Sequence, residues 1–280
     1  MELLRTVAEL RQWSREQRSG GNPVGLVPTM GALHAGHASL IRAAAVSCGP
    51  VAVSIFVNPT QFGPNEDYAR YPRTFEADCA LAQAEGADAV FAPTVEELYP
   101  VGAATFVEVE GLSSRLDGAS RPGHFRGVAT VVAKLLIAAE PDRAFFGQKD
   151  AAQVAVVRRM VADLRLPAEI VVCPIVREPD GLALSSRNLF LSAAERVQAL
   201  VLSRAIRQAE ALAAAGERRS SALVAAARKT FAAVPEVRID YIAAVDWATL
   251  DPVEIAAPGT LFAVAARVGH TRLIDNTILN

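Results

Sequence analysis

The sequence predicts an α/β protein, a Rossmann-like doubly wound parallel sheet followed by a second, smaller α+β C-terminal domain. Over about the first 175 residues, short apolar runs alternate with amphipathic or Ala-rich stretches, the order of parallel strands and crossover helices. The segment 51–57 (VAVSIFV) is apolar almost without interruption, as in a strand covered on both faces. After residue 181 the order changes to two helices and then strands, which indicates a separate unit.

The first domain is expected to cover residues 1–176. Its predicted strands lie at 24–27, 51–57, 87–91, 143–146 and 169–176, and its predicted helices at 35–46, 74–85, 127–138 and 151–164. Right-handed connections between parallel strands place such helices on both faces of the sheet. Open sheets of this kind bind ligands at the carboxyl ends of their strands, so polar residues just after strands are the candidates for a site.

The second domain is expected to cover residues 177–280. Ser192 and Glu195 have the spacing of a capping box, which predicts that a helix begins there and runs over 193–215. A further helix is expected at 220–233, and strands at 237–245, 261–268 and 272–274. Helices followed by strands are typical of a small α+β unit.

Charge and composition exclude several classes of protein. The 280 residues carry a formal net charge of −2 without a Lys/Arg run, so nucleic acid is not an expected partner. Cys48, Cys79 and Cys173 share no metal-ligand spacing and are expected to be reduced thiols. The first residues lack the apolar core of a signal peptide, and no stretch is expected to span a membrane. We therefore expect a cytoplasmic protein.

The first of four polar clusters is 28–37 (PTMGALHAGH), directly after a predicted strand. His34 and His37 stand three positions apart at a helix start and project from the same side, and Gly31 permits an unusual turn. Main-chain N–H groups and the helix dipole favour a phosphate at such a terminus. Two alternatives stay open: polar cap residues, or a zinc pair for which the neighbouring sequence supplies no third ligand.

Three further clusters follow strands in the same way. The amides of 58–62 (NPTQF) would position a substrate by hydrogen bonds, and the hydroxyls and guanidinium of 184–188 (LSSRN) can wrap a phosphate chain. Lys149 in 147–150 (GQKD) suits a phosphate, with Gln153 one helical turn beyond it. The structural alternatives are a polar turn, a helix-entry turn and a surface Lys149–Asp150 pair. The P-loop and dinucleotide-binding glycine motifs are absent.

Together these motifs resemble the pantoate–β-alanine ligase family. The segment 34–37 (HAGH) is similar to the H-x-G-H signature of the nucleotidyltransferase superfamily, and 121–127 (RPGHFRG), 149–150 and 185–188 complete the family's set in order. The resemblance covers essentially the whole chain. It implies an ATP-dependent ligase that joins (R)-pantoate to β-alanine through a pantoyl adenylate, giving pantothenate, AMP and pyrophosphate.

The resemblance also implies roles for individual residues. His37, His34 and Lys149 would be catalytic, with His37 the proton donor or charge stabiliser. Gln61 and Gln153 would hold pantoate, and Gln61 would also lie near β-alanine. ATP would contact Met30, Gly31, Ala32, Leu33, His34, Ala35, Gly36, His37, Gly147, Gln148, Lys149, Asp150, Val176, Leu184, Ser185, Ser186 and Arg187.

The cofactors and partners implied are ATP as a substrate with Mg²⁺ on its phosphates, pantoate, β-alanine and a second copy of the chain in a homodimer. No tightly bound cofactor and no protein ligand to a metal is assigned. The smaller domain is expected to act as a lid, because a hydrolysable adenylate needs water kept out. The chain departs from the family at Ala152, and at Ala77 beside Asp78.

Two other functions fit part of the pattern. A nucleotidyltransferase that moves AMP or CMP onto a phosphate-bearing substrate would share H-x-G-H without needing the Gln61 and Gln153 pair. A catalytically inactive nucleotide-binding protein would have little use for both histidines, Lys149 and 185–187 together. A tRNA synthetase is the least expected, given the acidic balance and the length.

Overall fold

The computed structural model describes residues 1–64, 66 and 68–280, which form two compact units. The N-terminal unit holds Met1–Ser114, Arg121–Gly147 and Val156–Cys173. The C-terminal unit holds Arg115–Ser120, Gln148–Ala155 and Pro174–Asn280. Two short segments that precede residue 176 thus belong to the second unit.

Long-range contacts explain why these two segments join the C-terminal unit. The Nη1 atom of Arg272 lies 2.6 Å from Oδ1 of Asp117, and Nε1 of Trp247 donates to the carbonyl of Ala151 at 3.0 Å. Both contacts join residues far apart in the chain. The order of elements in the sequence therefore cannot indicate that these two segments belong to the C-terminal unit.

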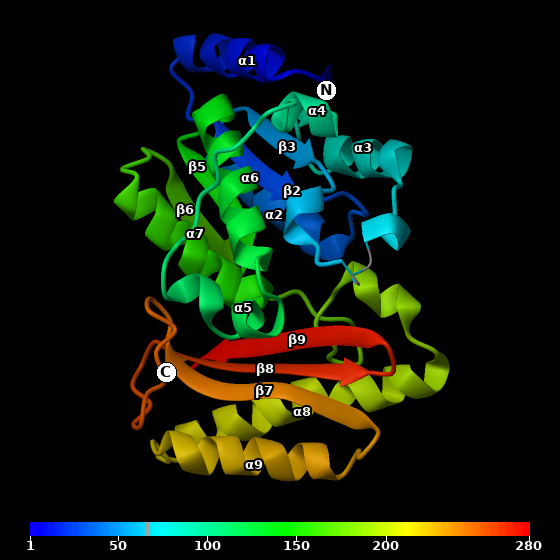
Figure 1. Cartoon of the computed structure of the whole chain (residues 1–280), viewed down its shortest axis with the longest axis vertical. Helices are drawn as coiled ribbons and strands as arrows, with labels where there is room; N and C mark the ends of the chain where they lie inside the picture. The colour runs from blue at the N-terminus through cyan, green and yellow to red at the C-terminus, as the bar shows by residue number, and fades with distance from the viewer. Residues whose placement is uncertain (65, 67) are drawn as a thin grey trace. The chain divides into compact units, whose positions relative to one another are not determined.

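The N-terminal unit is built on a six-stranded sheet in the order β1-β4-β3-β2-β5-β6. Figure 1 labels β3, β2, β5 and β6 of this sheet. The strands are β1 (Glu2–Leu4), β2 (Gly25–Thr29), β3 (Val51–Ile55), β4 (Ala89–Phe91), β5 (Arg143–Gly147) and β6 (Glu169–Cys173). All neighbouring pairs are parallel. β3 pairs with one edge of β2, and β5, which comes later in the chain, pairs with the other edge of β2. The strand order therefore reverses beside β2, where such folds bind ligands.

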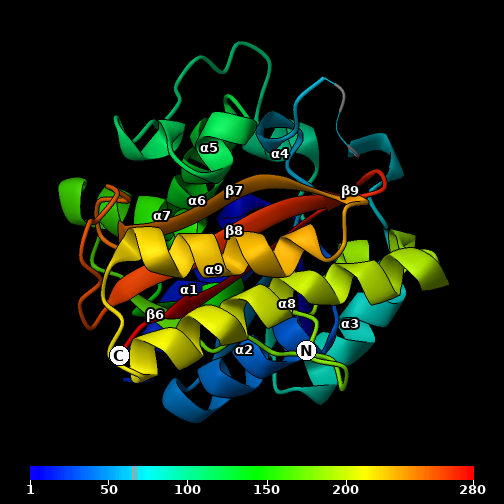
Figure 2. The same ribbon diagram turned by 90° about the horizontal axis from the view of Figure 1, so that it is seen from below.

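Helices cover both faces of this sheet. They are α1 (Val7–Ser19), α2 (Ala35–Ser47), α3 (Phe75–Ala84), α4 (Val95–Leu98), α6 (His124–Ala139) and α7 (Ala151–Asp163), of which residues 151–155 of α7 belong to the C-terminal unit. α2 packs on β2, β3 and β5 and beside α3, whereas α6 packs on β2 and α1; Figures 1 and 2 show α2 and α6 on opposite faces. Because side chains alternate along a strand, Val27 and Val53 join the core under α2 while Leu26 and Ala52 point the other way.

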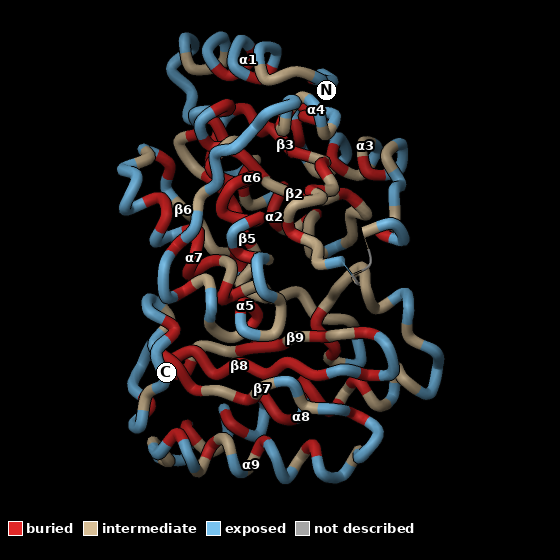
Figure 3. Tube along the Cα trace, viewed as in Figure 1, coloured by how far each residue is buried: buried red, intermediate tan, exposed pale blue. Residues whose placement is uncertain are grey.

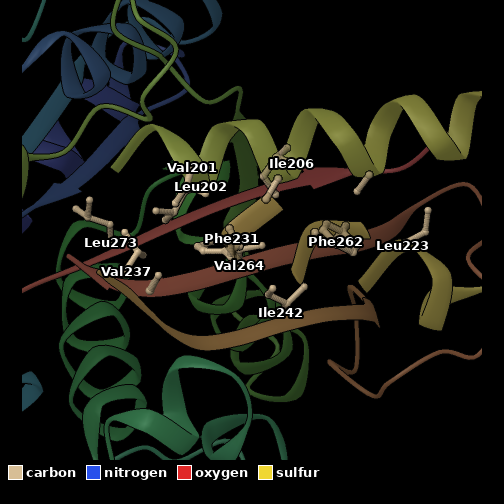
Figure 4. Close-up of a cluster of buried hydrophobic side chains, with 14 of the residues drawn as sticks. Val201, Leu202, Ile206, Leu223, Phe231, Val237, Ile242, Phe262, Val264 and Leu273 are labelled. Atoms are coloured by element: carbon tan, nitrogen blue, oxygen red, sulfur yellow. The ribbon is translucent and has the colours of Figure 1, made fainter. Parts of the chain in front are cut away.

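The C-terminal unit is a three-stranded antiparallel sheet with two helices on one face. Its elements are α5 (Asp117–Ser120), α8 (Ala193–Ala214), α9 (Ser220–Ala232), β7 (Val237–Asp246), β8 (Thr260–Val268) and β9 (Thr271–Ile278), with β8 central. α8 and α9 lie side by side over the strands (Figure 2). Leu202, Phe231 and Phe262 pack between the two layers (Figure 4), and β8 is buried along most of its length (Figure 3).

These elements confirm the predicted fold class of a doubly wound parallel sheet with a smaller α+β unit. The Ser192–Glu195 capping box is present at the start of α8 as predicted. The sequence reading missed β1, α1, α4 and α5, although Thr6 and Glu9 form a capping box at α1. No helix in the described part of the chain combines the length and apolar character needed to cross a bilayer.

Candidate functional site

The first predicted cluster forms the turn between β2 and α2. Gly31 and Ala32 both have left-handed backbone angles, with φ of 83° and 50°. They turn the chain from the end of β2 at Thr29 into α2, whose N-cap residue is His34. The unusual turn expected at Gly31 is therefore present and extends over one further residue.

The two histidines cap this helix and are fixed by main-chain hydrogen bonds. Nδ1 of His34 accepts the N–H of Gly36 at 3.1 Å, and Nδ1 of His37 accepts the N–H of His34 at 3.4 Å. The ring centroids are 4.2 Å apart. A ring nitrogen that accepts a hydrogen bond carries no proton, so each neutral ring holds its proton on Nε2. Both rings thus combine the cap role with a donor suited to a phosphate oxygen.

The main-chain N–H groups of this turn are already used inside the protein. Gly36 donates to His34, and Ala32 and Leu33 donate to the carboxylate of Asp78. The sequence reading expected these groups to favour a phosphate. In the described structure, a ligand could use these three N–H groups only by replacing a bond inside the protein.

The second cluster places Gln61 against the first. Gln61 ends a short 3-10 helix, Pro59–Gln61, and is 8% exposed. Its Oε1 accepts from Nδ2 of Asn58 at 3.2 Å, and its Nε2 donates to Sδ of Met30. Thioether sulfur is a weak acceptor, so a substrate oxygen would be a better partner for this amide. The structure therefore joins Gln61 to the cluster that carries the histidines.

The RPGHFRG motif holds the backbone of Gln61. Nδ1 of His124 lies 2.8 Å from the carbonyl oxygen of Gln61, and Nη1 of Arg121 lies 2.8 Å from Nε2 of His124. Arginine only donates, so Nε2 of His124 accepts and Nδ1–H donates to the carbonyl. A second donation to the same carbonyl comes from Arg121 at 3.3 Å. The sequence reading named this motif without giving it a role, and these contacts supply one.

Gly127 in the same motif allows α6 to lie against the Pro59–Gln61 turn. A Cβ built at Gly127 would lie 2.3 Å from the carbonyl oxygen of Thr60 and 2.6 Å from the nitrogen of Gln61. The carbonyl of Gly127 accepts from Nδ2 of Asn58 at 3.1 Å. Asn58 therefore ties the turn to α6 and orients the side chain of Gln61 at once.

Arg121 is itself held by Glu66, and this ion pair predicts that the stability of the protein depends on pH. Burial raises the pKa of Glu66, but the hydrogen bonds and the positive charge of Arg121 outweigh this effect and lower the pKa to about 2, below its ordinary value of 4.5. A carboxyl whose pKa falls on folding stabilises the protein above the unfolded pKa and loses this contribution as the pH drops through the folded one. We expect Glu66→Gln to reduce the acid sensitivity of unfolding between about pH 4.5 and pH 2.

The measurement is the midpoint of urea unfolding from pH 2 to pH 6 for both proteins. Glu169→Gln is the control, because its pair with Arg143 joins exposed side chains and such pairs contribute little. Parallel acid curves for wild type and Glu66→Gln would contradict the assignment.

Apart from Gly147, the third cluster lies in the C-terminal unit and is anchored to β9. Nδ2 of Asn276 donates to the carbonyls of Gln148 and Lys149 at 3.0 and 2.9 Å. Nζ of Lys149 lies 3.7 Å from Oδ1 of Asp150, too far for a close hydrogen bond. A surface pair is therefore a weak explanation for Lys149, whose side chain is only 23% exposed.

The fourth cluster follows a short turn in the same unit. The N–H of Leu184 donates to the carbonyl of Val176 at 2.9 Å, so these two residues close a hairpin-like turn. Ser185 then caps the 3-10 helix Ser186–Phe190 by accepting the N–H of Arg187 at 3.3 Å. The helix-entry turn weighed from the sequence is present, and it carries the two serines and the arginine together.

The structure thus gathers the predicted residues into two groups, one in each unit. Met30 to His37, Gln61 and Gly147 belong to the N-terminal unit, and the remaining residues belong to the C-terminal unit. Sequence reasoning did not assign Asp78, Glu66 or Asn276, since each acts through a contact with a distant part of the chain. Among the described residues, no three His, Cys, Asp or Glu side chains are placed to hold a metal ion.

Comparisons with known sequences match the whole chain to one family. The model of a family described as pantoate-beta-alanine ligase matches residues 2–278. A pantothenate synthetase of Acidobacterium capsulatum is 61% identical over all of this chain and 97% of its own length. A pantothenate synthetase of Moorella thermoacetica is 57% identical over all of this chain and 99% of its own.

Solved structures agree with the sequences. The pantothenate synthetase from Thermus thermophilus superposes with a TM-score of 0.94 at 49% identity, covering 99% of both chains. A pantoate-beta-alanine ligase from Francisella tularensis, complexed with beta-gamma ATP and beta-alanine, has a TM-score of 0.81 at 33% identity, covering 99% of this chain and 97% of its own.

Proposed function

Since the chain belongs to the pantoate–beta-alanine ligase family, we propose that it uses ATP to condense (R)-pantoate with β-alanine through a pantoyl adenylate. One contact supports the site assignment best. The amide of Gln61, assigned to pantoate, lies against Met30, the first residue of the segment assigned to ATP. The two substrates of the first step would therefore meet at this contact.

For ATP, the proposal assigns the residues from Met30 to His37 together with those of 147–150, Val176 and 184–187. His34 and His37 would donate from Nε2 to phosphate oxygens, because their Nδ1 atoms accept main-chain N–H groups. Lys149 would add a positive charge. Negative charge grows on the phosphate oxygens as the reaction proceeds, and donors fixed in advance are usually the largest catalytic contribution there.

For pantoate, the proposal assigns Gln61 and Gln153, with Gln61 also near β-alanine. Gln61 is oriented by Asn58 on its side-chain oxygen and by His124 and Arg121 on its carbonyl. A neutral amide can bind the hydroxyl and the carboxylate of pantoate without neutralising the carboxylate that must react. This orientation is what a near-attack geometry requires.

The reaction then proceeds in two steps. The carboxylate oxygen of pantoate attacks the α-phosphorus of ATP, and the bond to the β-phosphate breaks with release of pyrophosphate. The deprotonated amine of β-alanine next attacks the acyl carbon, and the bond to AMP breaks. Phosphoryl chemistry of this type depends on positioning and charge stabilisation, so the residues need not supply a covalent nucleophile.

The remaining assignments accompany this reaction. Mg²⁺ would enter on the phosphates of ATP and neutralise part of their charge. We also propose a homodimer in the cytoplasm, with no nucleic-acid or membrane partner, and the lid role of the smaller domain stays a prediction. Mg²⁺ and the homodimer rest on the family resemblance, whereas the other assignments rest on the charge, the composition and the need to keep water from the adenylate.

The test is an AMP assay on the purified protein with each substrate omitted in turn. We expect AMP to form only when ATP, pantoate and β-alanine are all present, because the second step releases it. Without β-alanine, pyrophosphate should form only up to about one equivalent per active site, since the adenylate stays bound. Continuous pyrophosphate release without AMP would instead favour a nucleotidyltransferase, the rival function that shares H-x-G-H.

A further inference from the structure

A carboxylate outside the assigned site holds the turn that carries the two histidines. Asp78 lies on α3 and is 2% exposed. Its Oδ2 accepts the N–H of Ala32 at 2.9 Å. Its Oδ1 accepts the N–H of Leu33 at 2.8 Å and the hydroxyl of Thr74 at 3.1 Å. One side chain thus fixes two successive amides of the turn and ties them to the start of α3.

The turn needs such support because its backbone is unfavourable. Ala32 has a φ of 50°, a conformation that sterics disfavour for a residue with a Cβ. At Gly31 an added Cβ would lie 3.0 Å from Oδ2 of Asp78 and 3.1 Å from Cγ2 of Ile55. The turn therefore lies in close contact with the carboxylate. An ionised carboxylate can accept hydrogen bonds from several N–H groups and has no donor of its own.

One side of the turn faces a cavity. Met30, Gly31 and Asp78 line a cavity of about 290 Å³, whose wall also includes Arg5 and Arg73. On this side the turn borders open space, whereas Leu33 packs against the buried core under α2. Without the hydrogen bonds to Asp78, the amides of the turn could reorient toward the cavity.

Attraction of a ligand does not explain the charge of Asp78. A carboxylate beside a phosphate-binding turn repels the phosphates, and both of its oxygens already accept from protein donors. Asp78 instead controls the main-chain geometry of the turn. The first turn of α2, with His34 and His37, follows directly from this geometry.

We propose that Asp78 is a positioning residue, which sets the turn at Gly31–Leu33 and thereby aims both imidazoles at ATP. The proposal rests on the function proposed above. In Asp78→Asn one oxygen is replaced by a donor that faces main-chain N–H groups. We expect the KM for ATP to rise and kcat to fall, each by roughly tenfold, while the KM for β-alanine stays unchanged.

Asp142→Asn is the matched control. Oδ2 of Asp142 accepts the N–H of Val24 at 2.8 Å, just before the other end of β2. Asparagine keeps one acceptor oxygen for this single N–H, so the variant removes a carboxylate charge away from the turn, and the KM for ATP should equal that of the wild type. Equal changes in the two variants would reduce Asp78 to a general structural role and overturn the proposal.

Amide hydrogen exchange tests the proposal without a substrate. In the wild type without ATP, the amides of Ala32 and Leu33 should be protected, and in Asp78→Asn they should exchange at least roughly tenfold faster. Unprotected amides in the wild type overturn the proposal even if the variant does not fold. If the wild type shows no ATP-dependent turnover, the proposed function fails, whereas the exchange result still decides the role of Asp78 in the turn.

Discussion

Gly127→Ala is expected to lower the thermal unfolding midpoint by on the order of 10 °C, which corresponds to a loss of about 3 kcal/mol. The added Cβ would lie 2.3 to 2.6 Å from three backbone atoms of Thr60 and Gln61. Backbone atoms cannot rotate away as the end of a side chain can. Either α6 or the Pro59–Gln61 turn must therefore shift, and the shift breaks the bond from Asn58 to the carbonyl of Gly127.

The same variant should lose most of its activity, because Gln61 moves with the turn. Gly63→Ala is the control, since its added Cβ would lie 3.7 Å from the nearest atom, Cγ of Glu66, which is ordinary contact. Thermal unfolding and AMP formation are measured for both variants. An unfolding midpoint for Gly127→Ala within about 2 °C of the wild type would mean that the close approach does not exist.

His34→Asn is expected to lower kcat by about 10²- to 10³-fold while leaving stability close to that of the wild type. Asparagine is a good N-cap residue and can accept the N–H that Nδ1 of His34 accepts now. It has no group at the place of the imidazole Nε2. The variant thus separates the cap role of His34 from its proposed role as a donor to phosphate.

His34→Ala completes this experiment, because alanine provides neither the cap nor the donor. It should lose about 1 kcal/mol of stability as well as the activity. Unfolding midpoints and initial rates of AMP formation are compared for the three proteins. Wild-type turnover in His34→Asn would show that the helix cap is the whole contribution of His34.

The apolar pattern of the sequence was enough to predict most of the fold. β2, β3 and β5 consist of buried residues for most of their length, which is why their runs were recognisable. β1 has only three residues, with two of them exposed, so it carries no such pattern. β9 runs over Thr271–Ile278, longer than the predicted 272–274. The prediction was too short because β9 buries polar residues such as Asp275 and Asn276, which interrupt the apolar pattern.

The sequence allowed the candidate site to be proposed as a set of residues but not as a set of contacts. The clusters stood out because Gly, His, Lys and Ser-Ser-Arg follow strands or turns in the sequence. The groups that hold them lie far away: Asp78 is 46 residues from Ala32, and Asn276 is 127 from Lys149. Only the folded backbone brings these partners together, so no spacing rule within a motif could have indicated them.

The capped histidines also bear on the entropy of substrate binding. Immobilising a side chain when a ligand binds costs about 0.5–1.5 kcal/mol. The rings of His34 and His37 are already fixed by amides of the turn and of α2, so this loss of freedom occurs when the helix forms. Under the proposed function, ATP would meet rings that are already held in place. A molecule that mimics its phosphates would gain the same advantage, which makes the first turn of α2 a favourable place for a rigid inhibitor to bind.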